Sequence, residues 1–106
     1  MWAAEDASLH FAVDGDTVTI VDTMAGHRGE NILMLDGRER EAHGYRIMAT
    51  QNRPDAIDVA AIQGSRIVSR IHYEVSKDGA TLTVRSLTAA HDGYPASEQK
   101  RVFTRA

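Results

Sequence analysis

The stretch "IHYEVSKDGATLTVRS", residues 71–86, holds two runs of strand-forming residues on either side of the tetrapeptide SKDG. Asp and Gly favour a tight turn because both tolerate a positive φ angle. With SKDG as a four-residue loop, Tyr73 faces Leu82 across the two strands. Ile71 then faces Val84, so the apolar side chains share one face, as a half-buried antiparallel pair requires. The stretch therefore predicts a β-hairpin.

A second hairpin is predicted near the start of the chain, in "LHFAVDGDTVTI". With Asp14-Gly15 as a two-residue loop, Phe11 faces Val18 across the strands. Leu9 likewise faces Ile20, and the polar residues of both strands fall on the opposite face. Two independent hairpins thus each place their apolar residues on one side.

Turn signals recur along the whole chain, at Asp14-Gly15, Asp36-Gly37, Gln63-Gly64, Asp78-Gly79 and Asp92-Gly93. Further strands are predicted at Asn31–Leu35, Tyr45–Gln51, Ala56–Ile62, Ser65–Val75 and Lys100–Arg105. Short strands separated by regular turns are typical of all-β sandwiches and barrels. The chain is therefore expected to form a single all-β domain over residues 1–106. We expect an antiparallel up-and-down meander of eight or nine strands that closes as a barrel, because closure removes the sheet edges.

The middle of the chain is less regular. Met24–Glu30 is predicted to be a connection near the mouth of the barrel, and Asn52–Asp55 to be a turn. The strand that contains Ile32–Leu35 is apolar on both faces and is followed by the charged, exposed Arg38–Glu41. A monomer would leave one of these apolar faces exposed, so we predict a homodimer that uses this strand or its neighbour.

Composition excludes several classes of function. The 106 residues include no cysteine, which rules out disulfides, zinc–thiolate sites and thiol nucleophiles. The net charge is -3 and the basic residues form no tract, so we expect no nucleic-acid partner. No apolar run approaches the ~20 residues that span a bilayer. Since the N-terminal residues also lack a signal-peptide pattern, we expect a cytoplasmic protein with no membrane partner.

The second half, "IDVAAIQGSRIVSRIHYEVSKDGATLTVRSLTAAHDGYPASEQKRVFTRA", resembles the tail of small bacterial lipocalin-like proteins. In that family a strand ending in V-S-x-D-G-x-T-L-T-V is followed by an irregular segment with D-G and a final strand similar to V-F-x-R. In the first half, "LHFAVDGDTVTIVDT" resembles the opening hairpin of the family, and "LDGRERE" resembles the turn before its central strands. Of the basic pair that family members often carry near the third strand pair, only Arg46 is present. The resemblance implies a calycin-type β-barrel with a pocket. Related calycin barrels bind hydrophobic small molecules, and some lipocalin-like barrels catalyse isomerisations or cyclisations.

The five histidines show no local metal-ligand spacing, so neither a metal site nor a cofactor is expected. His72 is the main catalytic candidate. Strand alternation places it on one face with Arg66, Arg70 and Glu74, where a His–Glu–Arg cluster would orient an imidazole for proton transfer. The alternative is a solvated outer face with cross-strand charge pairs. His10, opposite Thr19 in the predicted hairpin, is the second catalytic candidate.

The candidate ligand-binding residues combine aromatic rings with two arginines: Phe11, Tyr45, Arg46, Arg70, Tyr73 and Phe103. The aromatic members are alternatively ordinary core residues. Three functions therefore stay open: binding of a small, mostly apolar molecule, an isomerase or cyclase that uses a pocket histidine and tyrosine, and an interaction module with a filled core. Whether the protein is an enzyme stays undecided.

Overall fold

The computed structural model describes residues 1–42, 44–90 and 93–105, and all regular structure in these residues is β-strand. Within these ranges the strands are β1 (Trp2–Ala4), β2 (Ala7–Asp14), β3 (Thr17–Met24), β4 (His27–Met34), β5 (Arg40–Ala42), β6 (Tyr45–Arg53), β7 (Ala56–Gln63), β8 (Arg66–Val75), β9 (Thr81–Thr88) and β10 (Ser97–Arg105). The predicted all-β antiparallel meander is confirmed, with ten strands described instead of eight or nine. In the same residues we find no helix with the length and apolarity that crossing a membrane requires.

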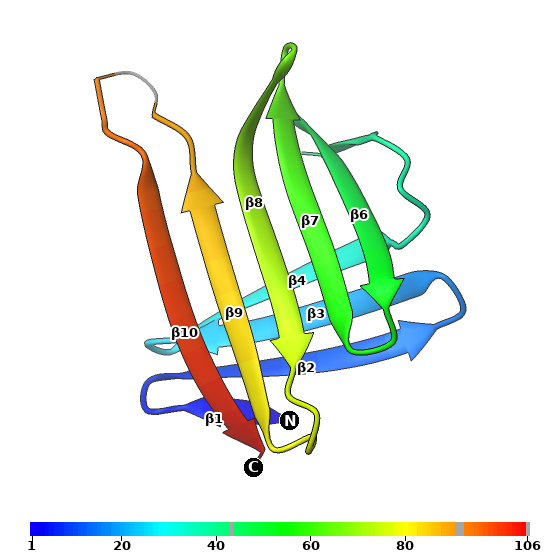
Figure 1. The fold of residues 1–106 in the computed structure, drawn as a ribbon, viewed down its shortest axis with the longest axis vertical. Coiled ribbons are helices and arrows are strands. Elements are labelled where there is room, and N and C mark those ends of the chain that lie inside the picture. Colours follow the sequence, from blue (N-terminus) through cyan, green and yellow to red (C-terminus); the bar gives the residue numbers. More distant parts are fainter. Residues whose placement is uncertain (43, 91–92, 106) are drawn as a thin grey trace.

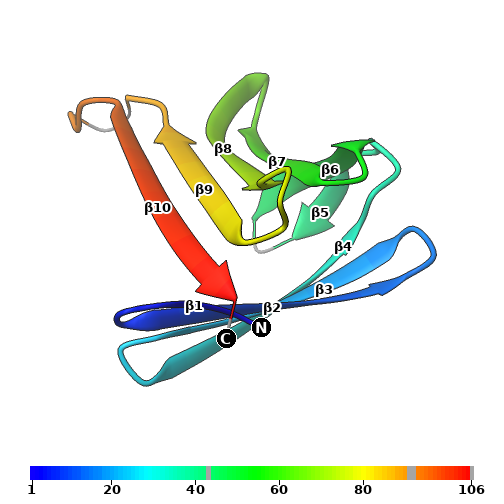
Figure 2. The same cartoon turned by 60° about the horizontal axis from the view of Figure 1, so that its bottom comes forward.

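One sheet contains all ten described strands, in the order β4-β3-β2-β1-β10-β9-β8-β7-β6-β5. The first strand pairs with the last, so the two ends of the chain lie side by side (Figure 1). The sheet curls into a half-barrel in which β2, β3 and β4 cross below β6 to β10 (Figure 2). Its two edges, β4 and β5, form no ladder with each other among the described pairings. An isolated bridge between Asp36 and Thr50 ties the connecting segment to β6 instead.

The registers of the two predicted hairpins are each wrong by two residues. Phe11 lies opposite Ile20 instead of Val18, and the loop is Gly15-Asp16. The physical reason is the positive φ of 60° at Gly15, which favours glycine as the first residue of a two-residue loop. Tyr73 likewise lies opposite Val84 instead of Leu82, because Ser76 bonds to Thr81 and the four-residue loop is 77–80, one position later than expected. A two-residue shift leaves every side chain on its expected face, so the apolar faces still agree.

The predicted connection at Met24–Glu30 is wrong, because β3 continues to Met24 and β4 already begins at His27. Only Ala25-Gly26 connects them, and both residues have positive φ angles, 50° and 82°. Such a pair forms a tight hairpin turn. Alanine is an unusual residue for a positive φ, so the sequence carried little signal of this turn. The predicted turn at Asn52–Asp55 is also shorter than expected, since β6 extends to Arg53.

The core lies where the two halves of the curled sheet cross. Val18 on β3 is 0% exposed and Leu82 on β9 is 1% exposed, and both pack in one cluster with Phe103 of β10. Trp2 joins this cluster from β1, and the Arg105 guanidinium lies 4.7 Å from the centre of its ring. Burying one such aliphatic side chain stabilises the fold by about 1.5–3 kcal/mol. The core therefore fixes how β1–β4 and β8–β10 sit against each other.

Candidate functional site

A cavity of about 460 Å³ lies between the edge strand β4 and the inner faces of β6, β7 and β8. Arg38, in the segment that connects β4 to β5, and Arg40, the first residue of β5, lie at its rim. The cavity therefore occupies the place where the half-barrel does not close. Its volume falls within the ~300–1,000 Å³ that small-molecule sites usually have.

The cavity wall consists of alternate residues of three neighbouring strands. These residues are Ile47 and Ala49 on β6, Val59 and Ala61 on β7, and Ser69, Ile71 and Tyr73 on β8. Alternation follows from the period of two in a β-strand, which sends every second side chain to the inner face. Two positions hold alanine, and their short side chains leave the space unfilled. This wall is mostly apolar, with the Ser69 hydroxyl and the Tyr73 hydroxyl as its polar exceptions. The opposite side of the cavity carries polar and charged residues, Glu30, Asn31, Arg38, Arg40 and Glu41.

A bulge in β8 determines which residues of this strand face the cavity. Ala61 pairs with Ser69, whereas Ile62 pairs with Ile67, so Val68 is an extra residue in β8. Because of the bulge, the side chains of β8 that precede Val68 lie on the opposite face of the sheet from the one that simple alternation predicts. Arg66 therefore does not share a face with His72 as the sequence predicted.

Hydrogen bonds from Arg38 and Arg40 to Asp36, here called the clamp, connect residues at the rim of the cavity. The Arg40 guanidinium donates two hydrogen bonds of 2.7 Å to the two carboxylate oxygens of Asp36. The backbone N–H of Arg38 also donates to Asp36, at 3.0 Å. The Arg40 hydrogen bond, followed by that of Arg38, lowers the pKa of Asp36 well below its ordinary value. The clamp orders the connection between β4 and β5 at the mouth of the cavity.

A second chamber of about 200 Å³ lies on the other side of Tyr73, between β2 and β3 below and β8, β9 and β10 above. Tyr73 and Ile71 line both chambers. The Phe11 ring packs against the Tyr73 ring edge to face, with 5.6 Å between the ring centres. Burial, and secondly the negative charge of Asp22, raise the pKa of Tyr73 to about 12. The hydroxyl of Tyr73 therefore stays protonated across the physiological pH range.

Asp22 is the site residue that sequence reasoning missed. It pairs with Leu9 of β2 and Gly29 of β4, and it lines the second chamber. Its Oδ1 atom is buried and has no hydrogen-bond partner among the described residues. A signal for it exists in the sequence: Val18, Ile20 and Asp22 occupy alternate positions, so a carboxylate follows two core residues on the same face.

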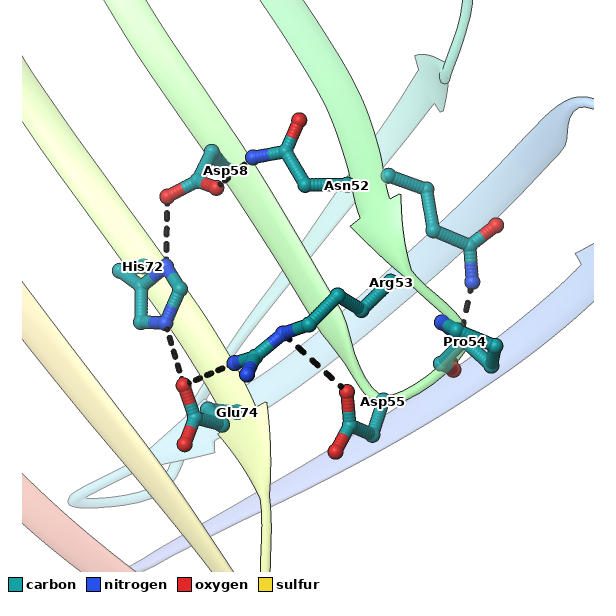
Figure 3. A network of polar contacts seen from close by, with 8 residues as sticks. Asn52, Arg53, Pro54, Asp55, Asp58, His72 and Glu74 are labelled. Atoms are coloured by element: carbon teal, nitrogen blue, oxygen red, sulfur yellow. Dashed lines mark hydrogen bonds and ion pairs between the residues drawn. The ribbon is translucent and has the colours of Figure 1, made fainter.

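His72 lies on the outer face of the sheet, away from both chambers, in the polar network shown in Figure 3. Its Nδ1 atom lies 2.5 Å from Asp58 Oδ1, and its Nε2 atom lies 3.0 Å from Glu74 Oε1. Arg53 reaches the same Glu74 oxygen at 2.6 Å. The hydrogen bonds to Glu74 and then to Asp58 raise the pKa of His72. Both ring nitrogens are thus occupied by carboxylates in a cross-strand charge network.

The remaining predicted site residues divide between the inner and outer faces. Tyr45 and Tyr73 line the cavity, and Phe103 lies in the core beside the second chamber. Arg46 is exposed and bonded to Glu39 at 2.9 Å and to the carbonyl of Gly64. His10 and Arg70 are also exposed, on the outer face. His43 and His91 lie outside the described residues. Within the described part of the chain, no group of three His, Asp or Glu side chains is arranged to hold a metal ion.

Neither a protein-family model nor a curated protein sequence matches this chain, so its site is interpreted from its own geometry.

Proposed function

We propose that the protein binds a small, mostly apolar molecule in the cavity between β4 and β6–β8. The observation that carries this proposal is a hollow of about 460 Å³ whose wall is built from alternate apolar residues of three strands. A concave, mostly apolar wall with a small number of polar groups is the usual composition of a small-molecule site. The resemblance to bacterial lipocalin-like barrels supports the same function.

The proposal does not extend to proton transfer by histidine. An acid or base must come within about 3 Å of the proton that it moves, directly or through one water. His72 and His10 lie on the outer face, on the other side of the sheet from the cavity. The polar groups that a bound molecule would meet are the hydroxyls of Tyr45, Tyr73 and Ser69, together with the polar and charged side chains that line the opposite side of the cavity, Glu30, Asn31, Arg38, Arg40 and Glu41. These groups orient a ligand by hydrogen bonds.

The experiment is a fluorescence titration with N-phenyl-1-naphthylamine, a neutral apolar probe that brightens in apolar surroundings. We compare the wild type with Ala61→Phe, which places a ring inside the cavity, because Ala61 lines its wall. The matched control is Ala12→Phe, since Ala12 is exposed on the outer face of β2. Thermal unfolding of all three proteins confirms that each is folded.

We expect Ala61→Phe to weaken probe binding by about tenfold or more, which corresponds to about 1.4 kcal/mol. Ala12→Phe should leave the affinity unchanged. A folded Ala61→Phe protein that binds the probe as tightly as the wild type would place binding elsewhere and overturn the proposal.

A further inference from the structure

We propose that the molecule bound in this protein carries a protonated amine, whose positive charge is recognised by Asp22 in the second chamber. This inference rests on the proposed function and names the class of its ligand: an organic cation with an apolar body. The body would fill the larger cavity, and the amine would reach past Tyr73 to the carboxylate.

Asp22 is held on the inner face of the sheet by its neighbours. It pairs with Leu9 on one side and Gly29 on the other, and Leu9 is a buried member of the core cluster. Directly paired residues of antiparallel strands share a face, so the Asp22 side chain also points inward. The carboxylate is thus carried into the interior by the same alternation that builds the core.

Gly29 provides the room that the carboxylate occupies. A Cβ atom at this position would overlap Asp22 Oδ1 and lie 3.3 Å from Asp22 Cγ. Gly29 does not have a positive φ, in contrast to the turn glycines. Backbone conformation therefore does not require glycine at this position. The close approach of the Asp22 side chain is what a larger residue would prevent.

The carboxylate lacks a countercharge in the described structure. Its Oδ1 atom is buried without a hydrogen-bond partner. The guanidinium that shares the chamber, Arg101, is bonded to Asp6 and lies 3.9 Å from the sulfur of Met24. An ionised group in an apolar interior is unfavourable unless an opposite charge or a donor meets it. Oδ1 itself lies against Gly29 and is closed to solvent, so an ammonium group in the second chamber would meet the carboxylate through Oδ2 and supply the missing charge, whereas Asp22 would repel a carboxylate ligand.

The two chambers adjoin on either side of two shared side chains. Tyr73 and Ile71 belong to the wall of each chamber. The smaller chamber, about 200 Å³, has Asp22, Ser86 and Gln99 among its polar lining residues. The wall that β6–β8 give to the larger chamber is mostly apolar. This division of polar and apolar surface matches an amine head on an apolar body.

The test uses three naphthalene compounds with the same ring: 1-naphthylmethylamine, 1-naphthylmethanol and 1-naphthoic acid. Their affinities are measured by isothermal titration calorimetry at neutral pH. The variants are Asp22→Asn, which removes the charge at nearly constant shape, and Asp14→Asn, which removes an exposed charge at the tip of β2. Because Asp22→Asn removes an unpaired charge from the interior, we expect it to fold.

We expect the wild type to bind the amine at least about tenfold more tightly than the alcohol. The acid should bind more weakly than the alcohol. Asp22→Asn should bring the amine and the alcohol to within about threefold of each other, whereas Asp14→Asn should keep the wild-type ratio.

Four results would overturn the inference. One is equal binding of the amine and the alcohol by the wild type, and another is an amine preference that survives Asp22→Asn. In both cases the apolar binding function stands, because the ring still binds. If none of the three compounds nor N-phenyl-1-naphthylamine binds, the proposed function fails together with the inference. Gly29→Ala gives a second perturbation, since its Cβ displaces the carboxylate without removing the charge; an unchanged amine preference there would also count against the inference.

Discussion

Replacing Gly29 by alanine should have opposite effects on stability with and without the Asp22 side chain. In the wild type the new Cβ overlaps Asp22 Oδ1 and lies 3.3 Å from Asp22 Cγ. The carboxylate must rotate or the strands must move apart. Overpacking of this kind costs about 1–3 kcal/mol. Alanine in a strand interior recovers about 0.5–1 kcal/mol because it loses less backbone freedom than glycine on folding.

We take the overpacking cost at the middle of its range, about 2 kcal/mol, and subtract the backbone gain. Gly29→Ala should then destabilise the wild type by about 1 kcal/mol. In an Asp22→Ala protein the overlap is absent, so the same change should stabilise the fold by about 0.5–1 kcal/mol. The coupling energy between the two positions should therefore be about 1.5–2 kcal/mol.

The assay is urea unfolding of the wild type, the two single variants and the double variant, followed by far-ultraviolet circular dichroism. Asp14→Ala replaces Asp22→Ala as the control background, because Asp14 is exposed and lies on β2. There Gly29→Ala should cost as much as it does in the wild type. A coupling below about 0.5 kcal/mol between positions 22 and 29, the usual limit of additivity, would show that the Asp22 carboxylate does not lie over Gly29.

Three further predictions concern the outer network, the core and assembly. The pKa of His72 is raised, so the stability that its bonds contribute is complete below its ordinary value of 6.5 and is lost as pH rises through the raised value. The pKa of Glu74 is lowered, so its share is present above its ordinary value of 4.5 and is lost as pH falls through the lowered value. Because the His72 side chain is 33% exposed, we expect His72→Gln to lower the free energy of unfolding by only about 0.5–1 kcal/mol between pH 5 and 6. Above about pH 9 the variant should differ little from the wild type. Both comparisons are made by urea unfolding. Leu82→Ala should destabilise the fold by about 2–5 kcal/mol in the same assay, because Leu82 is fully buried; a loss below about 1 kcal/mol would contradict its place in the core. Ile32 is 67% exposed on the edge strand, so Ile32→Asp should convert the expected homodimer to a monomer in light scattering, and a wild type that is itself monomeric would remove the dimer proposal.

Hydrophobic alternation was sufficient to predict the fold class and the facing of most side chains. Most inner positions of β2, β3, β8 and β9 are apolar, so a hairpin register wrong by two still gave the correct faces. The turn between β3 and β4 was missed because Ala25 carries no turn signal, although it adopts a positive φ. The strand β1 was missed because three residues are too few to show a period.

The candidate site was harder to predict than the fold, because it depends on pairings between distant strands. The sequence placed Tyr45 and Tyr73 among the binding candidates, and both line the cavity. It did not reveal that the bulge at Val68 changes which residues of β8 face inward. It also gave no reason to connect Asp22 with Gly29, since their closeness follows from the β3–β4 register. Local patterns determine faces, whereas the contents of a cavity are determined by long-range register.

The most direct test of the binding proposal is a set of intermolecular nuclear Overhauser effects between N-phenyl-1-naphthylamine and the methyl groups of the protein. The methyl groups of Ala49, Ala61 and Ile71 line the cavity, whereas that of Ala12 lies on the outer face. Binding in the cavity predicts effects between the probe's aromatic protons and the three inner residues, with none to Ala12. Effects confined to outer-face methyl groups, or none to any methyl group at saturating probe, would contradict a ligand-binding cavity between β4 and β6–β8.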